Sequence, residues 1–259
     1  MRAIPRVPGG IGRPGRYPAR VTAAADARFT VPLYFSTEAA GYLGVPERTF
    51  ARWTKGSGLG SQDRPTVTGA PLITEVPAES GRGPTIPFGG LAEGMFLSGL
   101  RRAGVPLQQI RPALDLVRSK LGVEHALASR RLYVAGAQLL WEVSETGVDT
   151  DARYTMRDLI VLRDGQYVFR QVIDQYLQRI TYDDEYARRL VLPRYEVAEI
   201  AADPEVNFGK PYFTHGGTPL SVVRDLLRAG ETLRDVAEDF GIPADEVTEF
   251  AQGERLLPA

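Results

Sequence analysis

Four side chains within residues 48–55 have the types and spacing needed to bind nucleic acid. Arg48 and Arg52 are one helical turn apart, so on a helix they would lie on one face. Thr49 lies between them in the sequence, and Lys55 follows. An arginine can donate two hydrogen bonds to a guanine edge, a threonine can contact a base or the backbone, and a lysine mostly neutralises phosphate. The group therefore indicates recognition of a polyanion.

Motifs of active sites and metal sites are missing from the chain. The absence of cysteine excludes disulfides, thiolate-bound zinc, iron–sulfur clusters and thiol nucleophiles. The chain has two histidines, His125 and His215. It has no phosphate-binding loop, no dinucleotide-binding glycine motif and no His-Glu-x-x-His sequence. Both histidines and the acidic run 183–185 are interpreted as turn residues, because each lacks the partners that catalysis or metal binding requires. We expect no enzymatic activity, no metal and no cofactor.

Two short helices joined by a tight turn would present the basic group, within residues 34–55. Ser36 or Thr37 is placed to cap the first helix. Gly44 would supply the turn, and Pro46 would start the second helix. Five apolar residues have the spacing of one shared core: Ala40, Leu43, Val45, Phe50 and Trp53. The pattern predicts a helix-turn-helix whose second helix enters the major groove, with a purely structural helical hairpin as the alternative.

This segment resembles the DNA-binding domain of the MerR-like and excisionase-like winged-helix group, through its alanine pair, glycine turn and arginine–tryptophan ending. The same order continues downstream, with a Pro/Gly-rich stretch over residues 56–87 and then two helices, the first over residues 91–103 and the second from Pro106 to Leu121, interrupted at Pro112. The resemblance implies a winged helix-turn-helix domain over residues 29–131.

The stretch 56–87 would form the wing of that domain. Short β-prone pieces are expected at residues 66–73 and 85–88. Arg64 or Arg82 would add a contact to the minor groove or to the DNA backbone.

Charge divides the chain into two parts of opposite sign. Residues 1–131 hold 18 basic and 9 acidic side chains, whereas residues 132–259 hold 13 basic and 23 acidic ones. A basic part typically meets a polyanion, and an acidic part stays solvated or meets a basic protein surface, with chance clustering as the alternative. Residues 1–28 are rich in Pro, Gly and Arg and lack apolar periodicity, so we expect a disordered arm there.

The overall composition is that of a folded, water-soluble protein. Of its 259 residues, 43% are hydrophobic, which is ample for a packed core. No run of 18 apolar residues and no secretory signal is present, so we expect a cytoplasmic protein without a membrane anchor.

Residues 132–195 have a different sequence pattern, with short β-prone segments and one segment of helical periodicity. Strands are expected at residues 180–182 and 188–192, among others, and a helix over residues 166–179. We interpret this region as a small α+β connector.

Residues 196–259 predict a C-terminal domain with a β-hairpin over residues 206–219 and a bundle of helices behind it. Thr232 is placed to cap the middle helix and Pro243 to start the last one. Three helices are expected, over residues 220–229, 233–240 and 244–252. The whole chain is therefore predicted to be mainly α with small β elements, in the α+β class.

Residues 207–250 are similar to a small antitoxin-associated domain that was formerly of unknown function. Pro219 stands where that family commonly has an arginine, so any role of that arginine does not carry over. The shared signature consists of Gly209-Lys210-Pro211, Gly217-Thr218, Ala229-Gly230-Glu231 and Ala237-Glu238-Asp239-Phe240.

The order of these pieces over residues 33–252 resembles a VapB-type antitoxin of a long subclass. The resemblance implies two partners: a PIN-domain ribonuclease toxin that the chain binds and silences, and its own double-stranded operator DNA, whose binding limits transcription of the pair. A homodimer is expected, because one short recognition helix reads few base pairs and a two-fold protein doubles the site. The first alternative is a stand-alone MerR-like regulator without a toxin, and the second is an enzyme whose middle region carries a site without a known motif.

Two arginines are candidates for the toxin contact, Arg234 and Arg255. An arginine is a suitable plug for the Mg²⁺-binding carboxylates of a PIN-type nuclease. The acidic surface of the antitoxin would otherwise face a basic, RNA-binding rim of the toxin.

Overall fold

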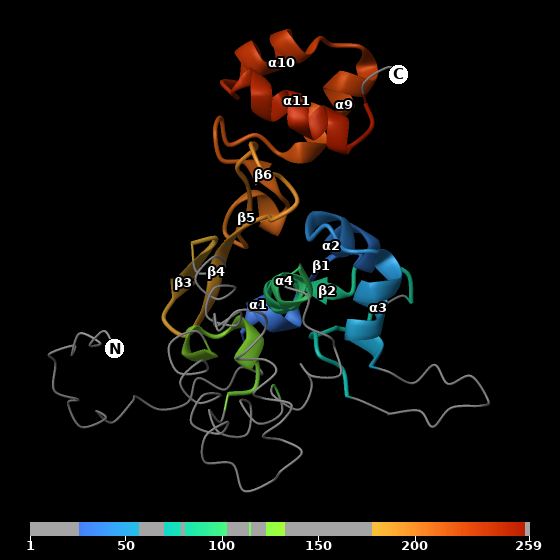
Figure 1. Ribbon diagram of the computed structural model, residues 1–259, viewed down its shortest axis with the longest axis vertical. Coiled ribbons are helices and arrows are strands. Elements are labelled where there is room, and N and C mark those ends of the chain that lie inside the picture. Colours follow the sequence, from blue (N-terminus) through green and yellow to red (C-terminus); the bar gives the residue numbers. More distant parts are fainter. Residues whose placement is uncertain are drawn as a thin grey trace, which may run out of the picture.

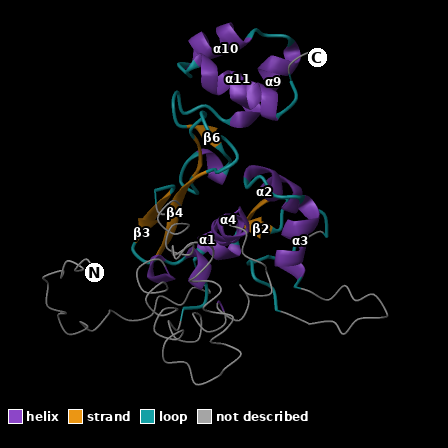
Figure 2. Cartoon of the chain, viewed as in Figure 1, coloured by secondary structure: helices purple, strands orange, loops and turns teal. Residues whose placement is uncertain are grey.

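The computed structural model describes residues 26–56, 70–78, 81–102, 114, 123–132 and 178–256. Figure 1 shows an N-terminal helical module, an antiparallel sheet that starts beside this module, and a C-terminal unit of three helices at one end of the long axis. The first two strands of the larger sheet lie beside the N-terminal module, and its last strand lies next to the C-terminal helices (Figure 2). This mixture of helices and small antiparallel sheets confirms the predicted α+β class.

The N-terminal module consists of α1 (Ala27–Thr30), β1 (Pro32–Tyr34), α2 (Ser36–Tyr42), α3 (Glu47–Lys55), β2 (Ile86–Pro87) and α4 (Phe88–Arg102). β1 and β2 are antiparallel, with Tyr34 opposite Ile86. α4 is the central element, because every residue from Phe88 to Leu100 is buried. The strand predicted at residues 85–88 is therefore shorter than expected: it ends at Pro87, and Phe88 already faces the core as part of α4.

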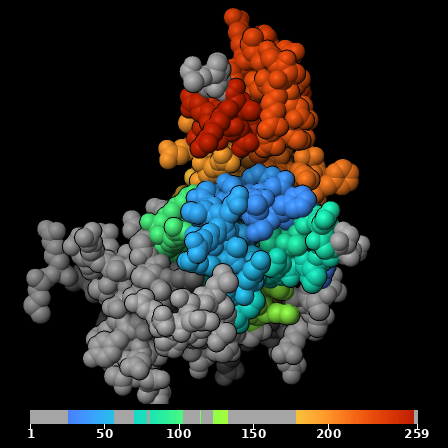
Figure 3. Space-filling model, turned by 90° about the vertical axis from the view of Figure 1, so that its right-hand side faces the viewer, coloured from blue at the N-terminus to red at the C-terminus, as the bar shows by residue number. Residues whose placement is uncertain are grey.

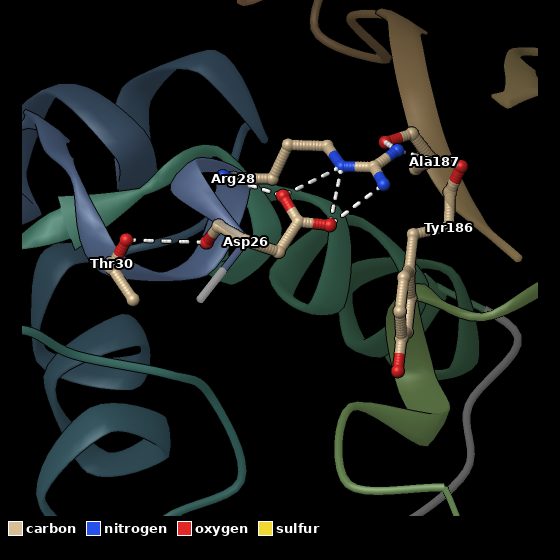
Figure 4. A network of polar contacts seen from close by, with 5 residues as sticks. All are labelled: Asp26, Arg28, Thr30, Tyr186 and Ala187. Carbon is tan, nitrogen blue, oxygen red and sulfur yellow. Dashed lines mark hydrogen bonds and ion pairs between the residues drawn. The ribbon is translucent and has the colours of Figure 1, made fainter. Parts of the chain in front are cut away.

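The last residues of the predicted disordered arm are part of an ordered helix start, which corrects that prediction. Asp26 caps α1 by accepting the backbone N–H of Arg28 at 2.9 Å, and it pairs with the Arg28 guanidinium at 2.7 Å. Figure 4 shows this pair beside β4 (Tyr186–Val191), where Arg28 Nη1 lies 3.4 Å from the carbonyl oxygens of Tyr186 and Ala187. Burial opposes ionisation of Asp26, but the hydrogen bonds and charge of Arg28 outweigh it, so the pKa of Asp26 lies below its usual value.

The larger sheet has the strand order β3–β4–β5–β6, and all neighbours are antiparallel. Besides β4, it contains β3 (Ile180–Asp183), β5 (Ile200–Ala202) and β6 (Tyr212–Phe213). The strands predicted at residues 180–182 and 188–192 are confirmed. Of the acidic run 183–185, Asp183 ends β3, and Asp184 and Glu185 form the turn to β4. The sheet pairs residues on both sides of position 195, where the sequence predicts a domain boundary.

The hairpin predicted over residues 206–219 is wrong in its first half. Residues Asn207–Gly209 form the 3₁₀ turn η4, and the strand paired with β6 is β5, with Ile200 opposite Phe213. The backbone φ angles from Asn207 to Gly209 are all positive, which excludes a strand there. The glycine-rich turn itself is present, since the Phe213 N–H donates to the Thr218 carbonyl at 2.9 Å.

The three C-terminal helices match the prediction to within one residue: α9 (Leu220–Ala229), α10 (Leu233–Phe240) and α11 (Ala244–Gly253). Thr232 caps α10 by accepting the Asp235 N–H at 3.1 Å, and Pro243 directly precedes α11, both as expected. Glu249 of α11 accepts the backbone N–H groups of residues 196–198, which joins this unit to the sheet. The buried core of the unit includes Val223, Val236, Ala237, Ile242, Val247 and Phe250.

Both histidines lie in turns, as predicted, and both contact a buried glutamate. His125 stacks on Phe29 with ring centroids 3.8 Å apart, and its Nδ1 lies 3.2 Å from Oε1 of Glu93 in α4. His215 Nδ1 lies 2.6 Å from Oε1 of Glu246 in the first turn of α11. These contacts connect loops to helices.

Several predictions fall outside the described residues. They concern the arm up to residue 25, the wing residues 57–69 with Arg64, and the predicted helix at residues 166–177. Residues 70–73 of a predicted wing piece are described and are not strand. Within the described ranges, no helix combines the length and apolar character needed to cross a membrane.

Candidate nucleic-acid interface

The first helix of the predicted helix-turn-helix, α2, begins without the side-chain cap that the sequence predicts. Phe35 is the N-cap residue, and Ser36 and Thr37 already lie inside the helix, so the prediction that one of them caps it is wrong. Glu38 replaces that cap, since its Oε2 accepts the Phe35 N–H at 3.0 Å. Its charge also lies in the first turn, where the helix dipole favours an anion.

The turn between α2 and α3 forms at Gly44, as predicted, and is held by α4. Gly44 has a backbone φ angle of +65°, which residues with a Cβ rarely adopt. Arg102 Nη2 donates to the Leu43 carbonyl at 3.1 Å, and its Nη1 donates to the Pro193 carbonyl at 3.2 Å. One arginine thus fixes the turn to α4 and to the segment that follows β4. α3 starts directly after Pro46, as predicted.

The inner face of α3 packs in the core that the sequence predicts. Phe50 and Trp53 are buried, with ring centroids 6.1 Å apart. The Trp53 carbonyl accepts the backbone N–H groups of Leu72 and Ile73, so the chain returning from the wing region closes over the end of α3. The other buried members of this core are Ala39, Ala40 and Leu43, and Val45 packs against them. With its inner face fixed, the outward direction of α3 is fixed as well.

The outer face of α3 carries the predicted cations. Arg48, Arg52 and Lys55 are exposed and lie at i, i+4 and i+7, which places them on one side of the helix. Among the described residues none of the three forms an ion pair, so their charges are directed to solvent. The space-filling view shows the blue segment that contains α2 and α3 on the molecular surface (Figure 3).

The structure adds a fourth cation that the sequence analysis missed. Arg101, in the last turn of α4, is exposed, and its Nη1 donates to Thr49 Oγ1 at 2.7 Å. Thr49 is half-buried beside Arg48, Arg52 and Lys55, which we call the cationic stripe. The bond therefore brings the Arg101 guanidinium to the outer face of α3. By sequence, Arg101 is an ordinary cation at a helix C-terminus. No local pattern connects it to a residue 52 positions away.

Of the two wing arginines, only Arg82 is described. It is exposed in a bend over residues 81–83. Arg64 lies outside the described residues, and its predicted DNA contact stays a prediction.

The two arginines predicted to contact a toxin lie in the C-terminal unit, away from α3 (Figure 1). Arg234 is on α10, where its Nε lies 2.8 Å from Oε1 of Glu238, one turn further along. Arg255 is exposed two residues after the end of α11, with a φ of +55°. The structure does not bring the two together with the cationic stripe.

Comparison with known proteins supports this division of the chain. A family model described as "Putative DNA-binding HTH domain" matches residues 32–114, and a second, described as "Protein of unknown function (DUF433)", matches residues 200–252. The chain is 42% identical to "Putative antitoxin VapB45" of Mycobacterium tuberculosis over 224 residues, which covers 86% of this chain and 93% of the relative. The chain belongs to the VapB-type antitoxins. Family membership and the matched domain make this antitoxin a non-enzymatic, DNA-binding regulatory protein.

A further curated protein and a solved structure, both from Mycobacterium tuberculosis, also resemble this antitoxin. "Uncharacterized protein Rv2308" is 25% identical over 223 residues, covering 83% of this chain and 87% of the relative. The crystal structure of Rv2018 superimposes with a TM-score of 0.71 at 40% identity and covers 86% of this chain and 99% of its own. The architecture described above is thus shared with an experimentally determined structure.

Proposed function

We propose that this antitoxin binds its own operator DNA through α3, and that it binds and inhibits a PIN-domain ribonuclease toxin in the cytoplasm. The observation that carries the DNA part is the outer face of α3, where three exposed cations stand on a helix whose inner face is buried. A helix fixed in this way enters a major groove with its side chains already oriented.

The side chains of this surface have different roles in the proposal. Arg48 and Arg52 reach base edges, because a guanidinium can form two hydrogen bonds to guanine O6 and N7. Lys55, at the end of α3, neutralises a phosphate and contributes salt-dependent affinity. Arg101 positions the Thr49 hydroxyl beside them.

The proposal includes a homodimer on a palindromic operator. α3 has nine residues, and its three cations point outward, so one copy reads only a few base pairs. Two copies related by a two-fold axis double the number of contacts, and the half-site spacing then follows from the distance between the recognition helices.

For toxin inhibition, family membership is the main support, and Arg255 is the better of the two arginine candidates. Arg234 is engaged with Glu238 on its own helix. Arg255 is exposed after the end of α11, where it can reach a carboxylate cluster that binds Mg²⁺. α10 exposes Asp235, Glu238 and Asp239, which suit a basic rim around such a site.

Co-expression with the protein encoded beside it tests the toxin part directly. A neighbour that is toxic alone, copurifies with this chain and loses its toxicity supports the proposal. A harmless neighbour that does not copurify rejects it and leaves a stand-alone MerR-like regulator. Replacing Arg255 by alanine is expected to weaken silencing, whereas Arg228→Ala, at an exposed arginine of α9, serves as the matched control.

A further inference from the structure

Phe208 is the most exposed large apolar side chain among the described residues. It is 90% exposed, whereas the other five such side chains are between 37% and 53% exposed. An aromatic ring of this size is costly to leave in water and is typical of the anchor residues of protein interfaces. Its position in a folded and well-connected part of the chain needs an explanation.

The backbone holds the Phe208 ring outward at a conformational cost. Asn207, Phe208 and Gly209 have successive φ angles of 50°, 53° and 78°, all in the left-handed region. Such a conformation is unfavourable for a phenylalanine and persists only where the surrounding structure imposes it; strained residues of this kind gather at functional sites. The turn is closed by bonds from the Gly209 N–H to the Val206 carbonyl at 2.9 Å and from the Lys210 N–H to the Asn207 carbonyl at 3.0 Å.

The turn is also anchored to the N-terminal module. Tyr34 Oη donates to the Gly209 carbonyl at 2.6 Å, and burial raises the pKa of Tyr34 well above its usual range, so the hydroxyl stays protonated as a donor. A Cβ at residue 209 would lie 2.6 Å from Leu33 Cδ1, and the φ of +78° at this position also favours glycine. Phe208 is therefore presented on a rigid support made of β1 and η4.

Other exposed apolar side chains lie around this support. Val31, Leu33 and Phe35 occupy every second position of the extended segment that contains β1; Val31 and Phe35 are exposed, and the partly buried Leu33 contacts the Phe208 turn. Four of the six exposed large apolar side chains belong to the two segments that meet here: Val31 and Phe35 next to β1, and Val206 and Phe208 next to or within η4. Figure 3 shows the blue N-terminal segment directly against the orange segment on one side of the molecule. We call Val31, Leu33, Phe35, Val206 and Phe208 the Phe208 surface.

The geometry points to a second copy of this chain as the occupant of the Phe208 surface. A two-fold interface requires one patch to be complementary to itself. Here a protruding ring stands on a turn that contacts the β1 segment, which carries exposed Val31 and Phe35, so each Phe208 can pack on Phe35 and Val31 of the other copy. The flanking charges are of opposite sign, because exposed Lys210 follows the ring and exposed Glu205, which pairs with Arg188, precedes it. This inference assigns the interface of the dimer proposed above and rests on that proposal.

Sedimentation of the full chain tests the assignment. Phe208→Asn removes the ring and keeps a residue that tolerates a positive φ. The dimer dissociation constant is expected to rise about 30-fold or more, as for a central interface anchor. The matched control is Val197→Asn, at an exposed apolar residue that precedes β5, whereas Phe208 follows β5; it should change the constant by less than about threefold. Equal constants for Phe208→Asn and the wild type would overturn the assignment.

Disulfide trapping gives a second, independent test, because the chain contains no cysteine. Two differently tagged copies, one with Phe35→Cys and one with Phe208→Cys, are mixed and oxidised. A covalent heterodimer is expected, and the control pair of Val197→Cys with Phe208→Cys should give none. Equal cross-linking of the two pairs would reject the interface.

The outcomes also separate this inference from the proposed function. A wild-type chain that is monomeric at all concentrations would reject the proposed dimer itself. A Phe208→Asn chain that stays dimeric would reject only the interface assigned here. A variant that keeps the dimer and loses toxin binding assigns the Phe208 surface to the toxin and overturns the second copy as its occupant.

Discussion

Arg101, at the end of α4, donates a hydrogen bond of 2.7 Å to the hydroxyl of Thr49 on α3. The bond joins the helix that forms the core of the N-terminal module to the helix that we propose reads DNA. It lies on the exposed side of both, so it orders a side chain at the proposed interface before any DNA is bound. Such preorganisation lowers the entropy that ordering these groups on binding would cost.

The operator contact is tested by replacing Arg48 and Arg52 with alanine together. A bidentate arginine–guanine contact contributes about 1 to 3 kcal/mol of discrimination, so the double variant should lose about 100-fold or more in specific operator affinity. Fluorescence anisotropy with promoter DNA measures this. The variant should still bind the toxin, and Arg228→Ala should bind operator normally. Undiminished affinity would show that α3 is not the recognition helix.

Lys55 should affect binding in another way. A phosphate contact contributes sequence-independent affinity through counterion release, so Lys55→Gln should weaken specific and non-specific DNA similarly. The slope of log affinity against log salt concentration should become shallower by about 1. An unchanged slope with lost discrimination among sequences would instead place Lys55 at a base edge.

The Arg101–Thr49 bond predicts a coupled effect on DNA binding with little effect on stability. Thr49→Val removes the acceptor and should reduce operator affinity about fivefold, since it loses one hydrogen bond of about 1 kcal/mol. Thr49→Ser restores the hydroxyl and should restore affinity. In a double-mutant cycle with Arg101→Ala, the two effects should not add. Additive effects would mean that the two residues act independently.

Asp26 should contribute stability that depends on pH. Its pKa is lowered in the folded chain, so its contribution is fully present above the unfolded value of 3.8 and is lost as the pH falls through the folded value. Asp26→Asn should lower the free energy of unfolding by about 1 kcal/mol at pH 7 through the weakened cap and the lost ion pair. The difference from the wild type should shrink below pH 4.

Denaturant unfolding at pH 7, 5 and 3 measures that difference. Asp184→Asn is the matched control, because Asp184 is exposed in the β3–β4 turn at a φ of 51°, which asparagine also tolerates. A stability difference for Asp26→Asn that is the same at pH 3 and pH 7 would contradict the assigned ion pair.

Local signals predicted the helical parts well. The capping threonine at residue 232, Gly44 in its turn and the prolines before α3 and α11 each act within a few residues. The apolar spacing of the two helix pairs is also local, so the cores around Phe50 and Phe250 could be assigned from sequence. The exposed stripe of Arg48, Arg52 and Lys55 followed as the remaining face of α3.

Where prediction failed, a distant partner or a strained backbone decided the structure. Asp26 and Arg28 look like the end of a disordered arm until Arg28 meets the carbonyls of β4, more than 150 residues away. The strand expected at residues 206–208 is excluded by positive φ angles that a Tyr34 hydrogen bond and the close approach of Leu33 support.

The sequence by itself determined the helix-turn-helix, the three C-terminal helices, the cations of α3 and the resemblance to an antitoxin. Tertiary structure alone decided that Arg101 joins those cations, that Arg102 holds the Gly44 turn, and that Phe208 stands out from β1 and η4. The physical reason is the range of the interactions. Caps, turns and helical periodicity depend on neighbours within about one turn, whereas these contacts form between segments that only the packed core brings together.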